Sequence, residues 1–196
     1  MFKRSMSALI LFLVLAFSGL SQQAVAQSNN GFAVVLIDMQ LGFYERGGTT
    51  DSVGLNKLVY NQSRLLKWSV QNKIPVLILE YERFGVTDPR LMKIVAGSSF
   101  KVIEKNQDGG FYGKSRNEVL KTLAGWKVDS LIVAGINGPY CVKDTIMGAL
   151  ESGFDVMTTS WVIGNINHNP PTFPNGSWYF KNSKFTVFPT LDSIIQ

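Results

Sequence analysis

The chain has 196 residues but only one cysteine, Cys141, and one histidine, His168. A lone cysteine has no partner within its own chain, which excludes an intramolecular disulfide framework. Lysine and arginine form no run, so the sequence lacks the basic footprint that marks nucleic-acid-binding proteins. It also lacks internal repeats, linkers and any change of composition that would separate two domains.

The first 26 residues have the pattern of an export signal. Lys3 and Arg4 supply a positive start, an apolar stretch covers 8–20, and 24–26 form a small-x-small cleavage site. The apolar stretch is shorter than the about 20 residues that a membrane span needs. We therefore expect a signal peptide at 1–26 and one domain at 27–196, with an uncleaved membrane anchor as the alternative.

Removal of the signal would leave 170 residues with a net charge of +3 in place of +5, enough chain for one substantial core. We expect this mature protein in the periplasm or outside the cell, where the environment is oxidising. An unpaired cysteine there stays free, pairs between chains or works as a thiol.

Apolar runs typical of buried strands alternate with segments of helical periodicity. Strands are expected at 32–37, 74–79, 100–104, 130–136 and 154–158, with a short sixth strand at 185–188 and an Asn/Pro-rich loop at 165–176. The alternation predicts an α/β fold, a three-layer, doubly wound, Rossmann-like and mainly parallel sheet of about six strands.

Four polar residues stand near the predicted carboxyl ends of strands, where ligands bind in such sheets. They are Asp38, Glu80, Lys105 and Cys141. Cys141 also opens a helical pattern, and a helix N-terminus favours the nucleophilic thiolate. The alternative for a lone cysteine is a small buried hydrophobe.

A cysteine nucleophile needs a base and a group that orients the base. Asp38 is the expected base, and Lys105 is the cation expected to hold the carboxylate and to favour the thiolate. Two alternatives stay open, namely His168 as the base of a Cys–His dyad and Lys114 in place of Lys105.

The segment 109–115 offers a different interpretation, because it resembles a phosphate-binding loop between a strand and a helix. That loop needs four residues between its glycines. Asp108 occupies the position of the first glycine, where its charge would repel phosphate. We therefore disfavour nucleotide binding.

Three motifs follow one another at the ends of predicted strands. The first is an apolar strand that ends in Asp-x-Gln (33–40), with Phe43 nearby; the second is a strand that ends in lysine (102–105), ahead of Gly-Gly-Phe (109–111). The third is the loop and helix around the cysteine, 135–149. In this order the motifs resemble the isochorismatase-like cysteine hydrolases, the superfamily that includes nicotinamidases and N-carbamoyl amide hydrolases.

The resemblance implies a hydrolase with Asp38, Lys105 and Cys141 as its catalytic set and no cofactor. Cys141 would attack a carbonyl carbon, release ammonia or an amine and form a thioester that water hydrolyses. The backbone N–H groups of Asn137 and Cys141 would form the oxyanion hole. The peptide bond between Ile136 and Asn137 is expected to be cis.

Departures from the family pattern bear on the substrate. Many relatives have Thr-Asp where this chain has Gly138 and Pro139. The nicotinamidase branch binds a metal through histidines after the first strand, and because none lies between Asp38 and Glu80 we expect no such metal site. Some relatives that act on isochorismate, an enol ether, lack the cysteine, so Cys141 favours an amide-type substrate.

Aromatic residues beside the motifs are candidates for the wall of a pocket for a flat or apolar substrate, with simple packing as the alternative for each: Phe43, Phe111, Tyr140 and Trp161. We expect a small-molecule substrate, no nucleic acid and no membrane after signal cleavage, and relatives commonly assemble, which leaves a homo-oligomer open. An inactive binding protein of this fold and a hydrolase of a non-amide, isochorismate-like substrate remain the alternative functions.

Overall fold

A computed structural model describes residues 31–46, 52–165 and 181–196. The expected signal peptide, His168 and nearly all of the expected loop at 165–176 lie outside the described residues. Within the described ranges, no helix combines the length and the apolar character that crossing a membrane requires.

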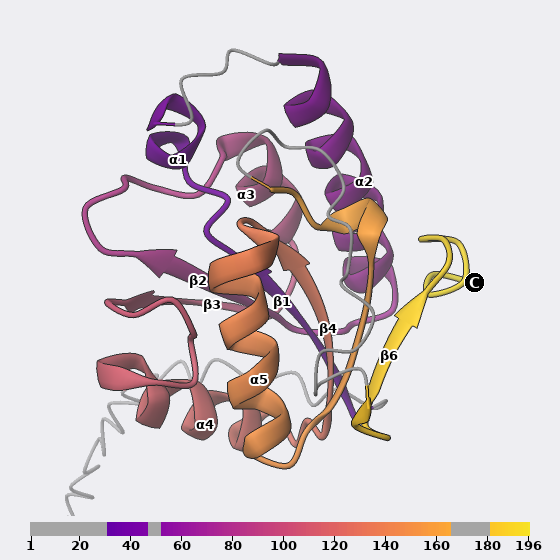
Figure 1. Cartoon of the computed structure of the whole chain (residues 1–196). Coiled ribbons are helices and arrows are strands. Elements are labelled where there is room, and N and C mark those ends of the chain that lie inside the picture. The colour runs from indigo at the N-terminus through magenta and orange to yellow at the C-terminus, as the bar shows by residue number, and fades with distance from the viewer. Residues whose placement is uncertain (1–30, 47–51, 166–180) are drawn as a thin grey trace, which may run out of the picture.

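Six parallel strands form one sheet in the order β3-β2-β1-β4-β5-β6 (Figure 1). The strands are β1 (Phe32–Ile37), β2 (Val76–Tyr81), β3 (Phe100–Lys105), β4 (Ser130–Gly135), β5 (Asp155–Thr159) and β6 (Phe185–Phe188). The predicted sheet is confirmed. The structure places β2 two residues later than the sequence pattern did, because the chain reaches the strand only after Pro75, which has no N–H to donate.

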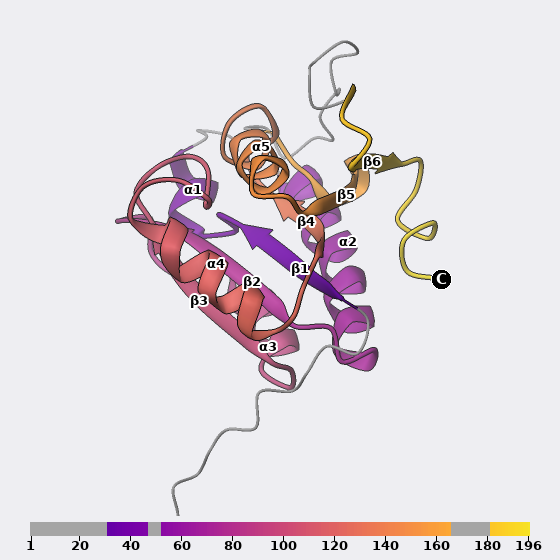
Figure 2. The same cartoon turned by 90° about the horizontal axis from the view of Figure 1, so that it is seen from below.

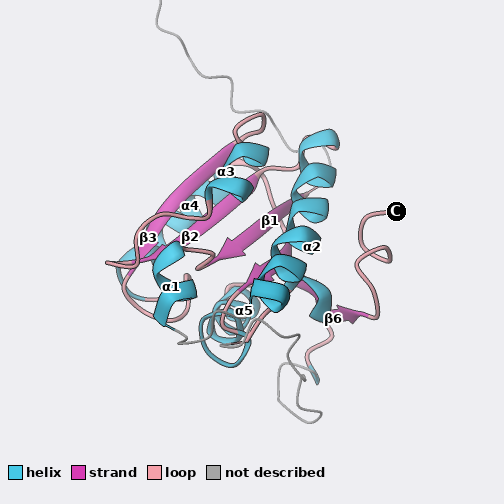
Figure 3. Ribbon diagram, turned by 90° about the horizontal axis from the view of Figure 1, so that it is seen from above, coloured by secondary structure: helices cyan, strands magenta, loops and turns pink. Residues whose placement is uncertain are grey.

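Helices cover both faces of the sheet. Helices α2 (Ser52–Gln71) and α3 (Pro89–Val95) lie on one face, and α4 (Arg116–Gly125) and α5 (Lys143–Glu151) lie on the other (Figures 2 and 3). A short helix, α1 (Leu41–Arg46), follows β1. Because both faces are covered, the central strands are continuous apolar runs, and in β1 the residues from Ala33 to Ile37 are at most 1% exposed.

The order of the strands creates one place where the chain reverses direction across the sheet. From β1 the chain steps outward to β2 and β3, and then returns to β4 on the other side of β1. The crevice outside the carboxyl ends of β1 and β4 is the position where doubly wound sheets bind their ligands. Asp38 directly follows β1, and the loop that carries Cys141 follows β4.

The side chain of Gln40 connects the segment after β1 to the segment after β2 by hydrogen bonds. This side chain is fully buried, its Nε2 donates to the carbonyls of Tyr81 (3.0 Å) and Gly85 (2.6 Å), and its Oε1 accepts from the Tyr81 N–H (2.6 Å). These bonds give partners to both polar atoms of a fully buried amide. The glutamine of the Asp-x-Gln motif therefore has a structural role beside the site.

Gly135 at the end of β4 allows the closest backbone approach in this crevice. Its φ is +139°, a conformation that side-chain-bearing residues rarely adopt, and an added Cβ would lie 2.2 Å from the carbonyl oxygen of Ile37. The two strands that carry the site can approach one another only with glycine here.

We therefore expect Gly135→Ala to lower the free energy of unfolding by ~2–4 kcal/mol, because backbone strain adds to the clash with β1. Urea denaturation measures the change. Gly97→Ala is the matched control, since its Cβ meets nothing within 4 Å, and it should change stability by less than ~0.5 kcal/mol. Equal stability of the two variants would contradict the prediction.

Candidate active site

A buried ion pair joins the ends of β1 and β3. Lys105, the last residue of β3, donates from Nζ to Oδ2 of Asp38 at 2.9 Å, and both side chains are fully buried. The lysine passes the end of β2, where its Nζ lies 4.3 Å from the centroid of the Tyr81 ring and also donates to the carbonyl of Gln107 (3.2 Å). These contacts compensate part of the cost of burying the ammonium group.

The two oxygens of the Asp38 carboxylate differ. Oδ2 accepts from Lys105, whereas Oδ1 is buried and has no hydrogen bond of standard geometry with any described residue. Burial raises the pKa of Asp38 to about 6, although Lys105 and the Cys141 thiol both act to lower it. At neutral pH the carboxylate is therefore mostly ionised and has one oxygen available to accept a proton.

Cys141 lies within a short π-helical turn, η2 (Gly138–Val142), directly before α5. The side chain is 4% exposed. Burial raises the pKa of its thiol, the charge of Asp38 raises the pKa further, and Lys105 lowers it. Burial and the Asp38 carboxylate thus shift the thiol pKa in the direction opposite to the one expected from a helix N-terminus. The thiol is protonated and needs a base.

The loop before the cysteine has the conformation that the resemblance implied. The Ile136–Asn137 peptide bond is cis. The carbonyl of Asn137 accepts from the N–H groups of Tyr140 and Val142, both at 3.1 Å, and the Gly138 N–H donates to Gly164 at 2.8 Å. In the described part of the chain the N–H of Asn137 meets no acceptor, which suits a group expected to bind an oxyanion.

The structure thus brings Asp38, Lys105 and Cys141 together and leaves two other candidates outside. The Glu80 carboxylate lies within β2 and accepts from the N–H and the hydroxyl of Thr87, both at 2.7 Å. Lys114 forms surface ion pairs with Glu82 and Glu104 instead of reaching Asp38.

The four aromatic candidates occupy different environments. Phe43 stacks on Phe84 with ring centroids 3.9 Å apart and meets Tyr81 edge-on at 6.3 Å. Because Tyr81 lies under Lys105, this aromatic cluster of Phe43, Phe84 and Tyr81 borders the ion pair. Tyr140, next to the nucleophile, is 60% exposed.

Phe111 and Trp161 are placed elsewhere. Phe111 is 1% exposed and packs against Phe154, so it belongs to the core beneath α5 and its position lends no support to substrate contact. Trp161 donates from its indole N–H to Pro189 at 3.2 Å and lies under Lys57, contacts that join α2 to the C-terminal segment. The sequence could not show where these two side chains point, because both residues lie beyond the end of a strand, where the alternation of polar and apolar residues no longer applies.

Sequence reasoning missed three residues at this site. Tyr81 and Phe84 form part of the aromatic cluster, and Asp108 places its Oδ1 3.8 Å from the sulfur of Cys141. Tyr81 could have been found, since it ends a strand beside Lys105. Asp108 comes three residues after its strand, in a loop whose path the sequence does not reveal.

Side-chain hydrogen bonds hold the loop 109–115 in place. The Gly110 N–H donates to the Thr145 hydroxyl at 3.1 Å, and the Ser115 hydroxyl donates to the carbonyls of Gly110 (2.9 Å) and Tyr112 (3.0 Å). The first of these bonds attaches the loop to α5, and the two from Ser115 lie within the loop itself. Across the described ranges, no group of three or more His, Cys, Asp or Glu residues could hold a metal ion.

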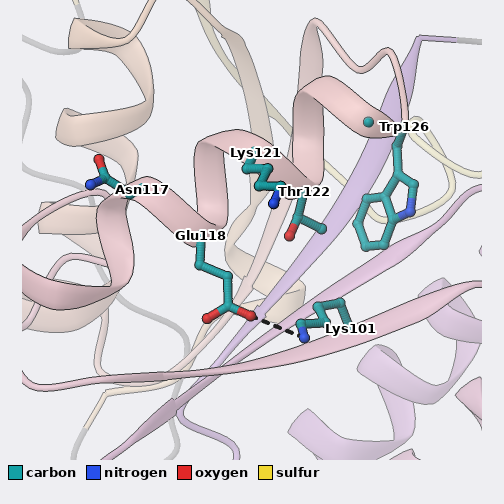
Figure 4. A pocket seen from close by; sticks show the side chains of 7 residues that line it. Lys101, Asn117, Glu118, Lys121, Thr122 and Trp126 are labelled. Carbon is teal, nitrogen blue, oxygen red and sulfur yellow. Dashed lines mark ion pairs between the residues drawn. The ribbon is translucent and has the colours of Figure 1, made fainter.

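A separate surface pocket of about 610 Å³ lies between α4 and the edge strand β3 (Figure 4). It is lined by Lys101, Asn117, Glu118, Lys121, Thr122, Gly125 and Trp126. Its only ion pair among these residues joins Lys101 and Glu118 at 3.0 Å. The lining contains no cysteine and no buried base, so the chemistry described above has no counterpart there.

The family to which the chain belongs can be identified by comparison with models of known protein families. The family model of the isochorismatase domain matches residues 32–165, which is more than half of the chain. The chain belongs to the isochorismatase family of hydrolases. The matched region begins at β1 and ends just after η3 (Ser160–Val162), so it contains every residue of the candidate site. No curated protein sequence is significantly similar to this chain.

Solved structures share the fold at low identity. The MAR1 ribonuclease from Caenorhabditis elegans has a TM-score of 0.62 and 19% identity, over 87% of this chain and 80% of that one. The N-carbamoylsarcosine amidase from Thermoplasma acidophilum has a TM-score of 0.59 and 17% identity, over 80% and 94%. The ycaC gene product of Escherichia coli, an octameric hydrolase of unknown specificity, has a TM-score of 0.56 and 20% identity, over 69% and 65%.

The pH dependence of Cys141 alkylation tests the role of Asp38. If Asp38 accepts the thiol proton, the rate of reaction with iodoacetamide should fall as the pH drops through about 6, where the carboxylate becomes protonated, and should level off above about pH 7. An ordinary thiol instead gains about tenfold per pH unit up to a pKa of about 8.5.

Asp38→Asn should remove the inflection near pH 6, whereas Asp155→Asn, at the opposite end of the sheet, should keep it. Mass spectrometry of the single thiol provides the rate. A wild-type profile that rises without inflection from pH 5 to pH 8 would rule out Asp38 as the base.

Proposed function

We propose that this protein hydrolyses a small amide-type substrate through a thioester on Cys141, with Asp38 as the base and Lys105 as the group that holds the base. One observation carries the proposal: Asp38 is fully buried near the Cys141 thiol, with one oxygen held by Lys105 and the other without a hydrogen bond of standard geometry to any described residue. A carboxylate held in this way can accept a proton at one defined atom.

In the first half of the reaction the sulfur of Cys141 attacks the carbonyl carbon, and its proton passes to Asp38. The negative charge that develops on the carbonyl oxygen is stabilised by the N–H groups of Asn137 and Cys141, and each such donor is worth about 2.7–4 kcal/mol. When the tetrahedral intermediate collapses, the C–N bond breaks and Asp38 returns the proton to the departing nitrogen.

In the second half water attacks the thioester. Asp38 accepts a proton from the water, the same N–H groups stabilise the second tetrahedral intermediate, and the thiol leaves with the proton. Lys105 keeps the carboxylate ionised between these transfers because its ammonium group cannot move away from the buried pair.

Two arguments favour this function over the alternatives. A binding protein has no need for a buried ion pair beside a thiol, since burying both charges costs several kcal/mol that the pair regains only in part. The presence of a nucleophilic sulfur favours an acyl substrate over an enol ether, which offers no carbonyl carbon to form a thioester. The fold shared with an N-carbamoylsarcosine amidase supports a C–N bond as the target.

A panel of small primary amides with ammonia detection tests the function. Cys141→Ala should reduce turnover at least ~10³-fold, because it removes the sulfur on which the thioester forms. Cys141→Ser keeps the shape and should be similarly impaired. Mass spectrometry after rapid acid quench should find the acyl group on the wild-type protein. Turnover that survives Cys141→Ala would refute the mechanism.

We also propose that the enzyme is exported and that it forms a homo-oligomer. The charged start, apolar stretch and cleavage site of 1–26 support a periplasmic or secreted enzyme whose mature chain begins at Gln27. The octameric state of the E. coli relative supports a homo-oligomer. The absence of nucleic-acid and membrane partners stays a prediction.

Expression of the full chain in a Gram-negative bacterium tests export. We expect periplasmic protein with Gln27 as its first residue, identified by mass spectrometry of the intact chain. Ala26→Asp should block processing, because the cleavage site requires small residues, and should leave the longer chain with the membrane fraction. Recovery of residues 1–26 on soluble cytoplasmic wild-type protein would exclude a signal peptide.

A further inference from the structure

Asp108 is a carboxylate at the site that the hydrolytic steps do not use. Its Oδ1 lies 3.8 Å from the sulfur of Cys141, and the residue is only partly buried. Among the described residues it forms no ion pair and no other hydrogen bond. Its charge thus faces the reacting sulfur without a cation of its own.

The charges around the thiol do not cancel. Asp38, Lys105 and Asp108 are the charged side chains that act on the thiol. Lys105 pairs with Asp38 at 2.9 Å, which leaves the charge of Asp108 uncompensated. Two carboxylates and one ammonium group thus give these three side chains a net negative charge beside the sulfur.

Neighbouring cations do not neutralise this charge, since they have acidic partners of their own. Lys143 at the start of α5 pairs with Asp144 at 3.3 Å. Lys114 pairs with Glu82 and Glu104.

The aromatic cluster beside the ion pair also favours a positive charge at the site. The face of an aromatic ring carries negative quadrupole charge, which attracts cations, and Tyr81 is the member of this cluster whose ring meets one. The structure contains one such contact already, between the ammonium group of Lys105 and the Tyr81 ring at 4.3 Å.

We propose that Asp108 sets the charge of the substrate: the site takes amides that carry a positive charge close to the scissile carbonyl and rejects those that carry a carboxylate there. Simple N-carbamoyl amino acids, which are anions at neutral pH, are then poor substrates. That such amides are substrates rests on the proposed function. The charge preference around Cys141 does not, and it can be measured without turnover.

The single thiol allows a direct test. Three methanethiosulfonate reagents of similar reactivity carry a trimethylammonioethyl group, a sulfonatoethyl group or a methyl group. In each reaction the sulfur of Cys141 attacks the sulfenyl sulfur of the reagent, a mixed disulfide forms and methanesulfinate leaves. The ratio of the cationic to the anionic rate constant reports the charge at the site, and any change in the thiol pKa cancels in this ratio.

We expect the wild-type ratio to exceed that of a small free thiol, and Asp108→Asn to lower the ratio at least about tenfold, the effect of removing a unit charge a few ångströms away. Asp108→Glu keeps the charge and should keep the ratio within about threefold. Asp155→Asn is the control, since it makes the same change of net charge at the other end of the sheet. Circular dichroism establishes that each variant is folded.

A ratio that Asp108→Asn leaves unchanged, or a fall of the same size in Asp155→Asn, overturns the proposal. Failure of all three reagents to modify folded wild-type protein also overturns it, because no ligand would then reach Asp108 beside the sulfur.

A matched pair of amides extends the test to turnover. Trimethylammonioacetamide should have a higher kcat/KM than malonamate, and Asp108→Asn should reverse or remove the preference. If no amide is hydrolysed while the labelling ratio behaves as expected, the proposed function fails and the charge preference stands. If amides are hydrolysed but the labelling ratio and kcat/KM show no charge preference, the proposed function stands and the charge preference fails.

Discussion

The ion pair between Lys105 and Asp38 is the interaction on which the rest of the site depends. It joins β3 to β1 across the end of β2, so it exists only when three adjacent strands are in register. Removal of one partner would leave an uncompensated buried charge, a change that costs about 3–5 kcal/mol. The pair also decides which oxygen of Asp38 remains available, and hence where a proton can go.

This arrangement reconciles two observations that conflict when each is taken alone. The thiol is held in its protonated form by burial and by the neighbouring carboxylate, which is unfavourable for a nucleophile. The same burial raises the pKa of Asp38 to about 6, which makes the carboxylate a stronger base than an exposed aspartate while leaving it ionised at neutral pH. Reactivity therefore resides in the pair, because the protonated thiol depends on the carboxylate to accept its proton.

Much of the fold and of the candidate site could be predicted from the sequence. The buried strands, their parallel order and the positions of Asp38, Lys105 and Cys141 follow from apolar runs that end in polar residues, since the carboxyl ends of parallel strands meet at one edge. The protonation state of Cys141 could not, because it depends on burial that only the packed structure defines. For the same reason the sequence could not decide between pocket wall and core packing for Phe111, which the structure places in the core, and Asp108 was missed because loop geometry brings it to the sulfur.

The 4% exposure of Cys141 has a consequence for the lifetime of the protein. Oxidants attack the thiolate in preference to the thiol, and susceptibility rises with exposure. In the unfolded chain Cys141 is an ordinary solvent-exposed thiol, whereas folding encloses it in protonated form. For an enzyme exported as proposed, completion of the sheet would thus shield its lone thiol from disulfide exchange with other proteins.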